Sequence, residues 1–206
     1  MKPIKKISGI TGGIGAGKSM VSRILRCNGF PVYDCDYEAG ILMNHNPEII
    51  RKIISCAGEE SYSEGSLNRK YLASLIFNNP EKRREINHIV HKAVKEDFIR
   101  FAEISFSDWI FVESAILFSS KIEELCQDVW IVDAPAQIRI ERVKERSNLD
   151  EEEIRKRMDS QESEYLLISE EKRIDIINDG KTSLLDEIMF LLNKKFNTIE
   201  LCLENC

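Results

Sequence analysis

Gly12-Gly13-Ile14-Gly15-Ala16-Gly17-Lys18-Ser19 is a glycine-rich segment near the start of the 206-residue chain, and it fits G-x-x-x-x-G-K-[ST] at every fixed position. Glycines let the backbone curl so that several amide N–H groups point at one phosphate. Lys18 can reach the β- and γ-phosphates of a nucleotide, and Ser19 can offer its hydroxyl to magnesium. A strand-like run precedes the segment and a helical pattern follows it, so the positive end of the helix would face the anion. The sequence therefore predicts a phosphate-binding loop rather than an ordinary glycine-rich turn.

Short apolar runs alternate along the chain with longer segments of helical periodicity. The expected strands cover residues 6–11, 30–33, 109–114, 129–133 and 174–178. Between them, apolar residues are spaced by three and four, as in helices. Such alternation favours a parallel sheet that is covered on both faces. We therefore expect an α/β fold of the P-loop NTPase type, with a five-stranded parallel sheet and helices on both faces.

Two segments do not fit this simple alternation. Residues 40–106 are too long for one crossover and predict a helical insertion that could bind a substrate. Residues 138–162 are dense in Arg, Lys and Glu, which predicts either a solvated helix pair with internal ion pairs or an arginine-rich lid. The core of the single expected domain then consists of residues 1–39, 107–137 and 163–206.

The composition argues against several kinds of protein. A formal net charge of -6 disfavours nonspecific nucleic-acid binding, which needs a basic surface. The six cysteines form no zinc-type C-x-x-C pairs, and the three histidines form no H-E-x-x-H motif. We find neither a signal peptide nor an apolar run of the roughly 18 residues that a membrane helix needs. We expect a cytoplasmic monomer or weak homo-oligomer with reduced thiols and with neither a nucleic-acid nor a membrane partner.

Three classes of protein share a loop of this kind: small-molecule kinases, GTP switches and ATP-driven motors. The chain lacks the N-K-x-D motif that recognises guanine. The apolar run at residues 109–112 of its expected strand ends in Glu113 rather than in the aspartate of a motor. Small kinases have an acidic residue after the second strand, a helical insertion and an arginine-rich lid. Candidates for all three features are present here, which favours a small-molecule kinase.

The acidic candidates after the second expected strand are Asp34 and Asp36. The carboxyl ends of strands in such sheets face the ligand crevice. If the strand extends this far, the alternation of side chains puts both carboxylates on the same side. One could accept a proton from an attacking hydroxyl, and the other could hold magnesium through water. The alternative is that the pair caps a helix or forms a turn, as aspartate often does.

The loop, with Gly9-Ile10-Thr11 before it and Val32-Tyr33-Asp34-Cys35-Asp36 after it, resembles the dephospho-CoA kinases, whose loop T-G-G-I-G-S-G-K-S is followed by D-A-D. Further matches occur in the family's order over nearly the whole chain: Leu67-Asn68-Arg69 with Leu72 and Ile76-Phe77, Asn79-Pro80 with His91, Gln137 with Arg142 and Arg146, Arg157 with Gln161, and Asp175 with Asn178 and Gly180. Glu113 keeps the acidic residue of the family's D-x-P-L-L-F-E segment, although the proline is replaced by Ala115.

The resemblance implies transfer of the ATP γ-phosphate to the ribose 3′-hydroxyl of dephospho-CoA, which gives coenzyme A and ADP in the last step of coenzyme A biosynthesis. It implies ATP and Mg²⁺ as cofactors, and Asp36 as the general base. The residues expected to contact ATP are those of the loop, Gly12, Gly13, Ile14, Gly15, Ala16, Gly17, Lys18 and Ser19, with Arg146 and, near the adenine, Asn178. The residues expected to contact the acceptor are Asp34, Asp36, Arg69, His91 and Glu113. Ser19 would bind magnesium, with Asp34 or Asp36 acting through water.

Arginines of the expected lid would stabilise the transferred phosphoryl group together with Lys18. Arg146 is the first choice and Arg142 the second, and Arg157 is a further candidate. Arg142 and Arg146 are four residues apart, so a helix places both on one face. A guanidinium group suits a phosphate better than an ammonium group does. The alternative for each arginine is a surface ion pair with a neighbouring glutamate.

Two other hypotheses remain open on the sequence alone. One is a related kinase that acts on a nucleoside or nucleoside monophosphate, against which Thr11 before the loop, the Asp34–Asp36 pair and Arg69 count. The other is a nucleotide sensor that has lost catalysis, against which the intact Lys18, Ser19 and Asp36 count.

Overall fold

The computed structural model describes residues 5–147, 149–165 and 168–203. The strands are β1 (Lys6–Thr11), β2 (Val32–Asp34), β3 (Tyr62–Ser63), β4 (Ser66–Leu67), β5 (Trp109–Glu113), β6 (Asp128–Asp133) and β7 (Arg173–Ile177). The α-helices are α1 (Lys18–Cys27), α2 (Cys35–His45), α3 (Pro47–Ala57), α4 (Arg69–Asn78), α5 (Pro80–Ile104), α6 (Ala136–Arg146), α7 (Glu151–Tyr165) and α8 (Leu184–Leu203). Short 3₁₀ helices cover Glu59–Ser61, Glu123–Leu125 and Glu170–Lys172.

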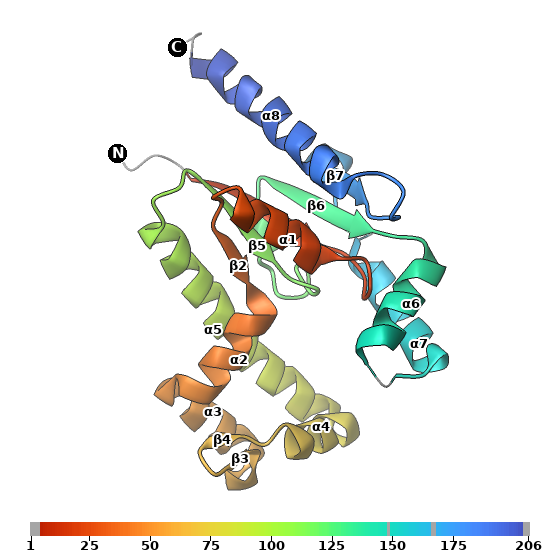
Figure 1. Cartoon of the computed structure of the whole chain (residues 1–206). Helices are drawn as coiled ribbons and strands as arrows, with labels where there is room; N and C mark the ends of the chain where they lie inside the picture. The colour runs from red at the N-terminus through yellow and green to blue at the C-terminus, as the bar shows by residue number, and fades with distance from the viewer. Residues whose placement is uncertain (1–4, 148, 166–167, 204–206) are drawn as a thin grey trace. The chain divides into compact units, whose positions relative to one another are not determined.

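The principal sheet has five strands in the order β2-β5-β1-β6-β7, with β1 at its centre (Figure 1). The pairings β1–β5, β1–β6 and β6–β7 are parallel. The expected five-stranded α/β fold is therefore confirmed. β5 is buried at every position, as expected for a parallel sheet that is covered on both faces. The central strand β1 also buries two polar residues, Ser8 and Thr11.

The main core lies between one face of this sheet and two helices. Ile10 is in register with Trp130, so the two side chains lie on the same face. Val21 and Leu25 of α1, together with Ile188 of α8, pack into the same cluster of buried residues. This packing fixes the direction in which α1 leaves β1, and it therefore fixes the turn between them.

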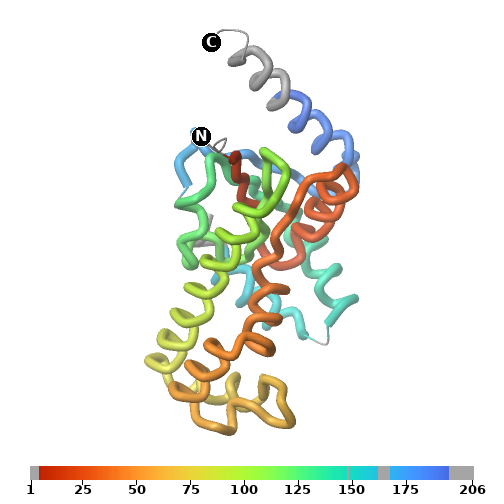
Figure 2. The backbone as a smooth tube through the Cα atoms, turned by 90° about the vertical axis from the view of Figure 1, so that its left-hand side faces the viewer, coloured from red at the N-terminus to blue at the C-terminus, as the bar shows by residue number. Residues whose placement is uncertain are grey.

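Contacts between Cα atoms divide the chain into two compact units, Met1–Val32 with Ser107–Cys206 and Tyr33–Phe106. The second unit is largely helical, and its helices α2 and α3 run beside the long helix α5 (Figure 2). Asparagine side chains accept amide hydrogens at the start of three of its helices, which is what a good N-cap does. These caps are Asn46 for α3, Asn68 for α4 and Asn79 for α5.

Tyr33 opens the second unit and ties it to α5. Its hydroxyl donates to Oδ2 of Asp97 at 2.8 Å, and its ring lies against Phe98 and Phe101. Burial, and next the hydrogen bond to Asp97, raise the pKa of Tyr33 above its usual range. The phenol therefore remains a hydrogen-bond donor at physiological pH.

Among the described helices, none combines the length and apolar character needed to cross a membrane.

Candidate active site

The glycine-rich segment forms the connection between β1, which ends at Thr11, and α1, which begins at Lys18. Gly17 caps α1 with a φ of +103°, in the left-handed region that favours glycine. A Cβ at this position would also overlap Nδ2 of Asn178. Backbone conformation and close packing therefore both demand glycine where the helix starts.

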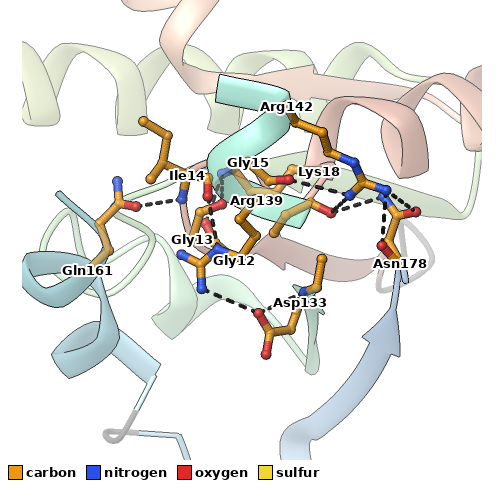
Figure 3. Close-up of polar contacts among 12 residues, drawn as sticks. Gly12, Gly13, Ile14, Gly15, Lys18, Asp133, Arg139, Arg142, Gln161 and Asn178 are labelled. Carbon is orange, nitrogen blue, oxygen red and sulfur yellow. Dashed lines mark hydrogen bonds and ion pairs between the residues drawn. The ribbon is translucent and has the colours of Figure 1, made fainter. Parts of the chain in front are cut away.

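The carbonyl groups of Gly12 to Ala16 in this loop all accept hydrogen bonds from side chains (Figure 3). Nζ of Lys18 donates to Gly12 O at 2.8 Å and to Gly13 O at 3.4 Å. Arg139 donates to Ile14 O, and Arg142 donates to Gly15 O and Ala16 O. Asn178 also donates to Ala16 O. A carbonyl held in this way cannot turn toward an anion. The first amides of α1 have no intrahelical acceptor and carry the positive end of the helix dipole. The loop therefore favours an anionic group at the N-terminus of α1.

Arg142 and Asn178 form one connected support for the loop. Nη2 of Arg142 donates to the backbone oxygen of Asn178 at 3.1 Å and to its Oδ1 at 3.3 Å. Nδ2 of Asn178 donates to Ala16 O at 2.9 Å, and its backbone N–H donates to Asp133 O at 2.7 Å. The carboxyl end of β7 is thus linked both to β6 and to the loop. Of the arginines expected in the lid, Arg142 is the one that contacts the loop in the part of the chain that the structure describes.

Arg139 is a residue that the sequence interpretation missed. It lies on α6 with 5% of its surface exposed, and its Nε donates to Ile14 O at 3.0 Å. Its Nη1 lies 3.5 Å from Oδ1 of Asp133. Arg139 and Arg142 are three positions apart, so both face the same side of α6. The spacing of the two arginines was the signal in the sequence that could have indicated Arg139. A surface ion pair with a neighbouring glutamate explained the same spacing equally well.

Ile14 is held at three points by the α6–α7 segment. Besides the bond from Arg139, its N–H donates to Oε1 of Gln161 at 2.7 Å. Its side chain packs against the buried cluster of Ile140, Val143, Ile154 and Met158. The interpretation of residues 138–162 as a helix pair with internal ion pairs holds for the outer surface, where Lys144 and Arg155 both contact Glu151. The inner surface contacts the loop.

The other expected site residues of the first unit lie at separate places. Ser19 is exposed in the first turn of α1. Arg146 is the last residue of α6 and Arg157 lies on α7, and both are exposed. Glu113 ends β5 with 8% of its surface exposed, in register with Ile10 of β1. Its carboxylate is thus held at the carboxyl end of the sheet, next to the strand that leads into the loop.

Asp34, Asp36, Arg69 and His91 belong to the second unit. The strand does not extend through Asp36, because Oδ1 of Asp34 accepts the N–H groups of Asp36 and Tyr37, at 3.1 Å each, and starts α2. The helix-cap alternative therefore describes Asp34, and Asp36 is exposed in the first turn of α2. Arg69 is the exposed first residue of α4, and His91 is half-buried on α5.

Magnesium, which the loop motif implies, would find few ligands in the protein itself. Within residues 5–147, 149–165 and 168–203, no three His, Cys, Asp or Glu side chains are grouped so that they could hold a metal ion. A magnesium ion that arrives with a nucleotide needs only one or two protein oxygens, since phosphate and water supply the others. The exposed hydroxyl of Ser19 fits this requirement.

A parallel five-stranded sheet whose central strand runs through a G-x-x-x-x-G-K-[ST] loop into a helix defines a P-loop nucleotide-binding protein of the kinase type. Residues 6–183 match the family model described as CoaE: Dephospho-CoA kinase. The chain belongs to the dephospho-CoA kinase family, and its activity is that of an ATP-dependent phosphotransferase acting on dephospho-CoA.

Individual relatives agree with this assignment. A dephospho-CoA kinase of Porphyromonas gingivalis is 40% identical over 184 residues, which cover 89% of this chain and 91% of the relative. In the crystal structure of TT1252 from Thermus thermophilus, the sequence is 28% identical to this chain. The two structures superpose with a TM-score of 0.77 over 93% of this chain and 97% of that one. The fold of the dephospho-CoA kinase from Campylobacter jejuni is also similar, with a TM-score of 0.65 at 23% identity over 92% of this chain and 96% of that one.

Proposed function

We propose that the loop of residues 12–19 holds the triphosphate of ATP while its γ-phosphoryl group moves to the ribose 3′-hydroxyl of dephospho-CoA. The observation that supports this most strongly is the occupation of every carbonyl from Gly12 to Ala16 by a side-chain donor. Phosphoryl transfer depends mainly on positioning and on stabilisation of charge. A loop that is already shaped for an anion meets both needs without reorganisation.

In this proposal Asp36 accepts the proton of the 3′-hydroxyl. Its exposed position in the first turn of α2 leaves the carboxylate accessible to an acceptor. Asp34 is engaged by the helix cap through one oxygen, and its other oxygen is the one proposed to hold magnesium-bound water or the acceptor. Magnesium would be held by Ser19 and would neutralise charge on the β- and γ-phosphates.

Lys18, Arg142 and Arg146 are proposed to stabilise the transferred group, with Arg157 as a further candidate. Arg142 already contacts the carbonyls of Gly15 and Ala16. Arg146 is at the exposed end of the same helix, where its guanidinium group is not buried. Residues 138–162 would then serve as a lid that excludes water once both substrates are bound.

The adenine is proposed to lie near Asn178. A hollow of about 450 Å³ opens beside the turn after β7, and it is lined by Ile177, Asp179, Thr182, Ser183, Asp186 and Glu187. Three carboxylates in this lining disfavour a phosphate, whereas a neutral base with amino groups is compatible with them. Backbone N–H groups of Lys181 and Thr182 lower the pKa of Asp179, so it remains an acceptor.

Residues 40–106 are proposed to bind the acceptor, with contacts from Arg69 and His91. Glu113 is proposed to contact the acceptor as well, from the core formed by residues 1–39, 107–137 and 163–206. Substrates are small molecules in this account, and the protein is proposed to act in the cytoplasm as a monomer or weak homo-oligomer, without a nucleic-acid or membrane partner.

A coupled assay of ADP release tests the proposal when dephospho-CoA is compared with AMP, CMP and adenosine as acceptors. We expect turnover with dephospho-CoA, and ³¹P spectroscopy of the product should show a new 3′-phosphomonoester. Turnover with a nucleotide but not with dephospho-CoA would favour the nucleoside monophosphate kinase instead. Tight ATP binding with no turnover on any acceptor would favour the sensor.

A further inference from the structure

Arg139 is a buried arginine with one charged partner and an incompletely used guanidinium group. Nε donates to Ile14 O at 3.0 Å, and Nη1 reaches Oδ1 of Asp133 at 3.5 Å. Nη2 is buried and has no hydrogen-bond partner among the described residues. A buried charge with an unused donor is costly, so a residue of this kind needs a reason beyond stability.

The space around Nη2 indicates that reason. A Cβ added to Gly13 would overlap Nη2 of Arg139. The φ angle of Gly13 is not positive, so its backbone is not in the left-handed region that favours glycine. Position 13 therefore requires glycine because the guanidinium group of Arg139 occupies the space that a Cβ would need.

Arg139 also places a positive charge directly against the phosphate loop. Asp133, its charged partner, has 55% of its side chain exposed and so is partly screened by water, whereas Arg139 is buried. Asp133 therefore neutralises the charge of Arg139 only in part, and the remaining positive charge favours a bound polyphosphate even without direct contact.

We propose that Arg139 is a positioning residue for the nucleotide: its guanidinium group, packed into the space above Gly13 and bonded to Ile14 O, holds the phosphate loop in the shape that binds ATP. This inference rests on the proposed role of residues 12–19 in holding the triphosphate. It adds that α6 sets the affinity for ATP through Arg139, and that Gly13 and Arg139 depend on each other.

The first experiment compares Arg139→Ala and Arg139→Gln with Arg155→Gln, which removes an exposed arginine of the same α6–α7 segment. We expect both Arg139 variants to raise the KM and Kd for ATP about tenfold or more, as for the loss of a hydrogen bond from a charged donor. The KM for dephospho-CoA should change less than twofold, and Arg155→Gln should change neither constant. A general loss of structure would instead weaken both substrates together.

The second experiment is a double-mutant cycle with Gly13→Ala. We expect Gly13→Ala alone to raise the Kd for ATP about tenfold, and to have less than a twofold effect when Arg139 is already alanine. If Arg139→Ala does not fold, as judged by circular dichroism, the cycle is measured with Arg139→Gln, which also removes the guanidinium group.

The proposal is overturned if the Arg139 variants bind ATP as the Arg155 variant does, or if Gly13→Ala costs the same in both backgrounds. Failure of the wild-type protein to bind ATP would contradict the proposed function instead, so the two failures are distinguishable.

Discussion

At the scale of single residues, the proposed general base and the residues proposed to hold the phosphates belong to different units of the chain. Lys18, Arg142 and Asn178 are tied to loop carbonyls. Asp36 is exposed in the first turn of α2. An accessible carboxylate is what a general base requires.

Replacing Asp36 by Asn tests this division. We expect kcat to fall by about 10²–10⁴-fold, as for the loss of a general base, with little change in the Kd for ATP. Glu48→Gln is the matched control, because Glu48 is also an exposed acid in the first turn of a helix of the same unit. Equal activity of Asp36→Asn and the wild type would remove Asp36 from the mechanism.

Gly17 tests the geometry of the loop at the same scale. Alanine at this position would be strained at a φ of +103° and would overlap Asn178. We expect Gly17→Ala to raise the Kd for ATP at least about tenfold and to lower stability by about 1–3 kcal/mol. Gly29→Ala has a similar backbone strain, at a φ of +85°, but meets no atom within 4 Å. The Gly29→Ala variant should therefore be less stable than the wild type and should bind ATP with the wild-type Kd.

At the scale of elements, the strands could be predicted better than their ends. Residues 6–11 were predicted to form a strand and do so as β1, because an apolar run before a glycine-rich turn has few alternatives. The second strand was expected at residues 30–33 but covers Val32–Asp34. Asp34 ends it by capping α2, and a cap competes locally with strand geometry in a way that periodicity does not reveal.

The candidate site shows the same limit. The motif predicted Lys18 and its neighbours, because all the required residues are contiguous. The contact between Arg139 and Ile14 joins residues 125 positions apart, and it depends on how α6 packs. Local spacing does not determine such a contact, so the sequence interpretation missed Arg139. The roles of Asp36, Arg69 and His91 remain predictions.

Cys126 gives a prediction about pH for the segment between β5 and β6. Burial, helped by Asp128, raises the pKa of its thiol from 9.0 to about 12. The unfolded chain releases this proton at lower pH than the folded protein does. The stabilising contribution is therefore complete below about pH 9 and is lost progressively as the pH rises toward 12.

Urea unfolding between pH 8 and 10.5 measures this contribution. We expect the free energy of unfolding of Cys126→Ala to fall less steeply with pH than that of the wild type, by up to about 1.4 kcal/mol per pH unit. Groups that titrate in both proteins cancel in the comparison. Cys27→Ala, which changes an exposed thiol, should keep the wild-type slope. Parallel curves for all three proteins would show that the thiol of Cys126 does not titrate abnormally.

At the scale of the whole molecule, nucleotide and metal should act as one ligand. The described residues offer no metal cage of their own, so the proposed magnesium site depends on the phosphates. ATP with Mg²⁺ at 100 times its Kd should stabilise the protein by about 2.7 kcal/mol, and Tm should rise by about 5–10 °C. Magnesium alone should have almost no effect, and chelation by EDTA should abolish turnover. A large rise in Tm with magnesium alone would reveal a site that the account does not contain.

The most direct test of the phosphate loop is a crystal structure with a non-hydrolysable ATP analogue, Mg²⁺ and dephospho-CoA. We predict that the β- and γ-phosphates lie against the amides of residues 12–19, with Lys18 on the phosphates and the carboxylate of Asp36 within hydrogen-bond distance of the ribose 3′-hydroxyl. Triphosphate bound away from this loop, or Asp36 directed away from the acceptor, would contradict the account.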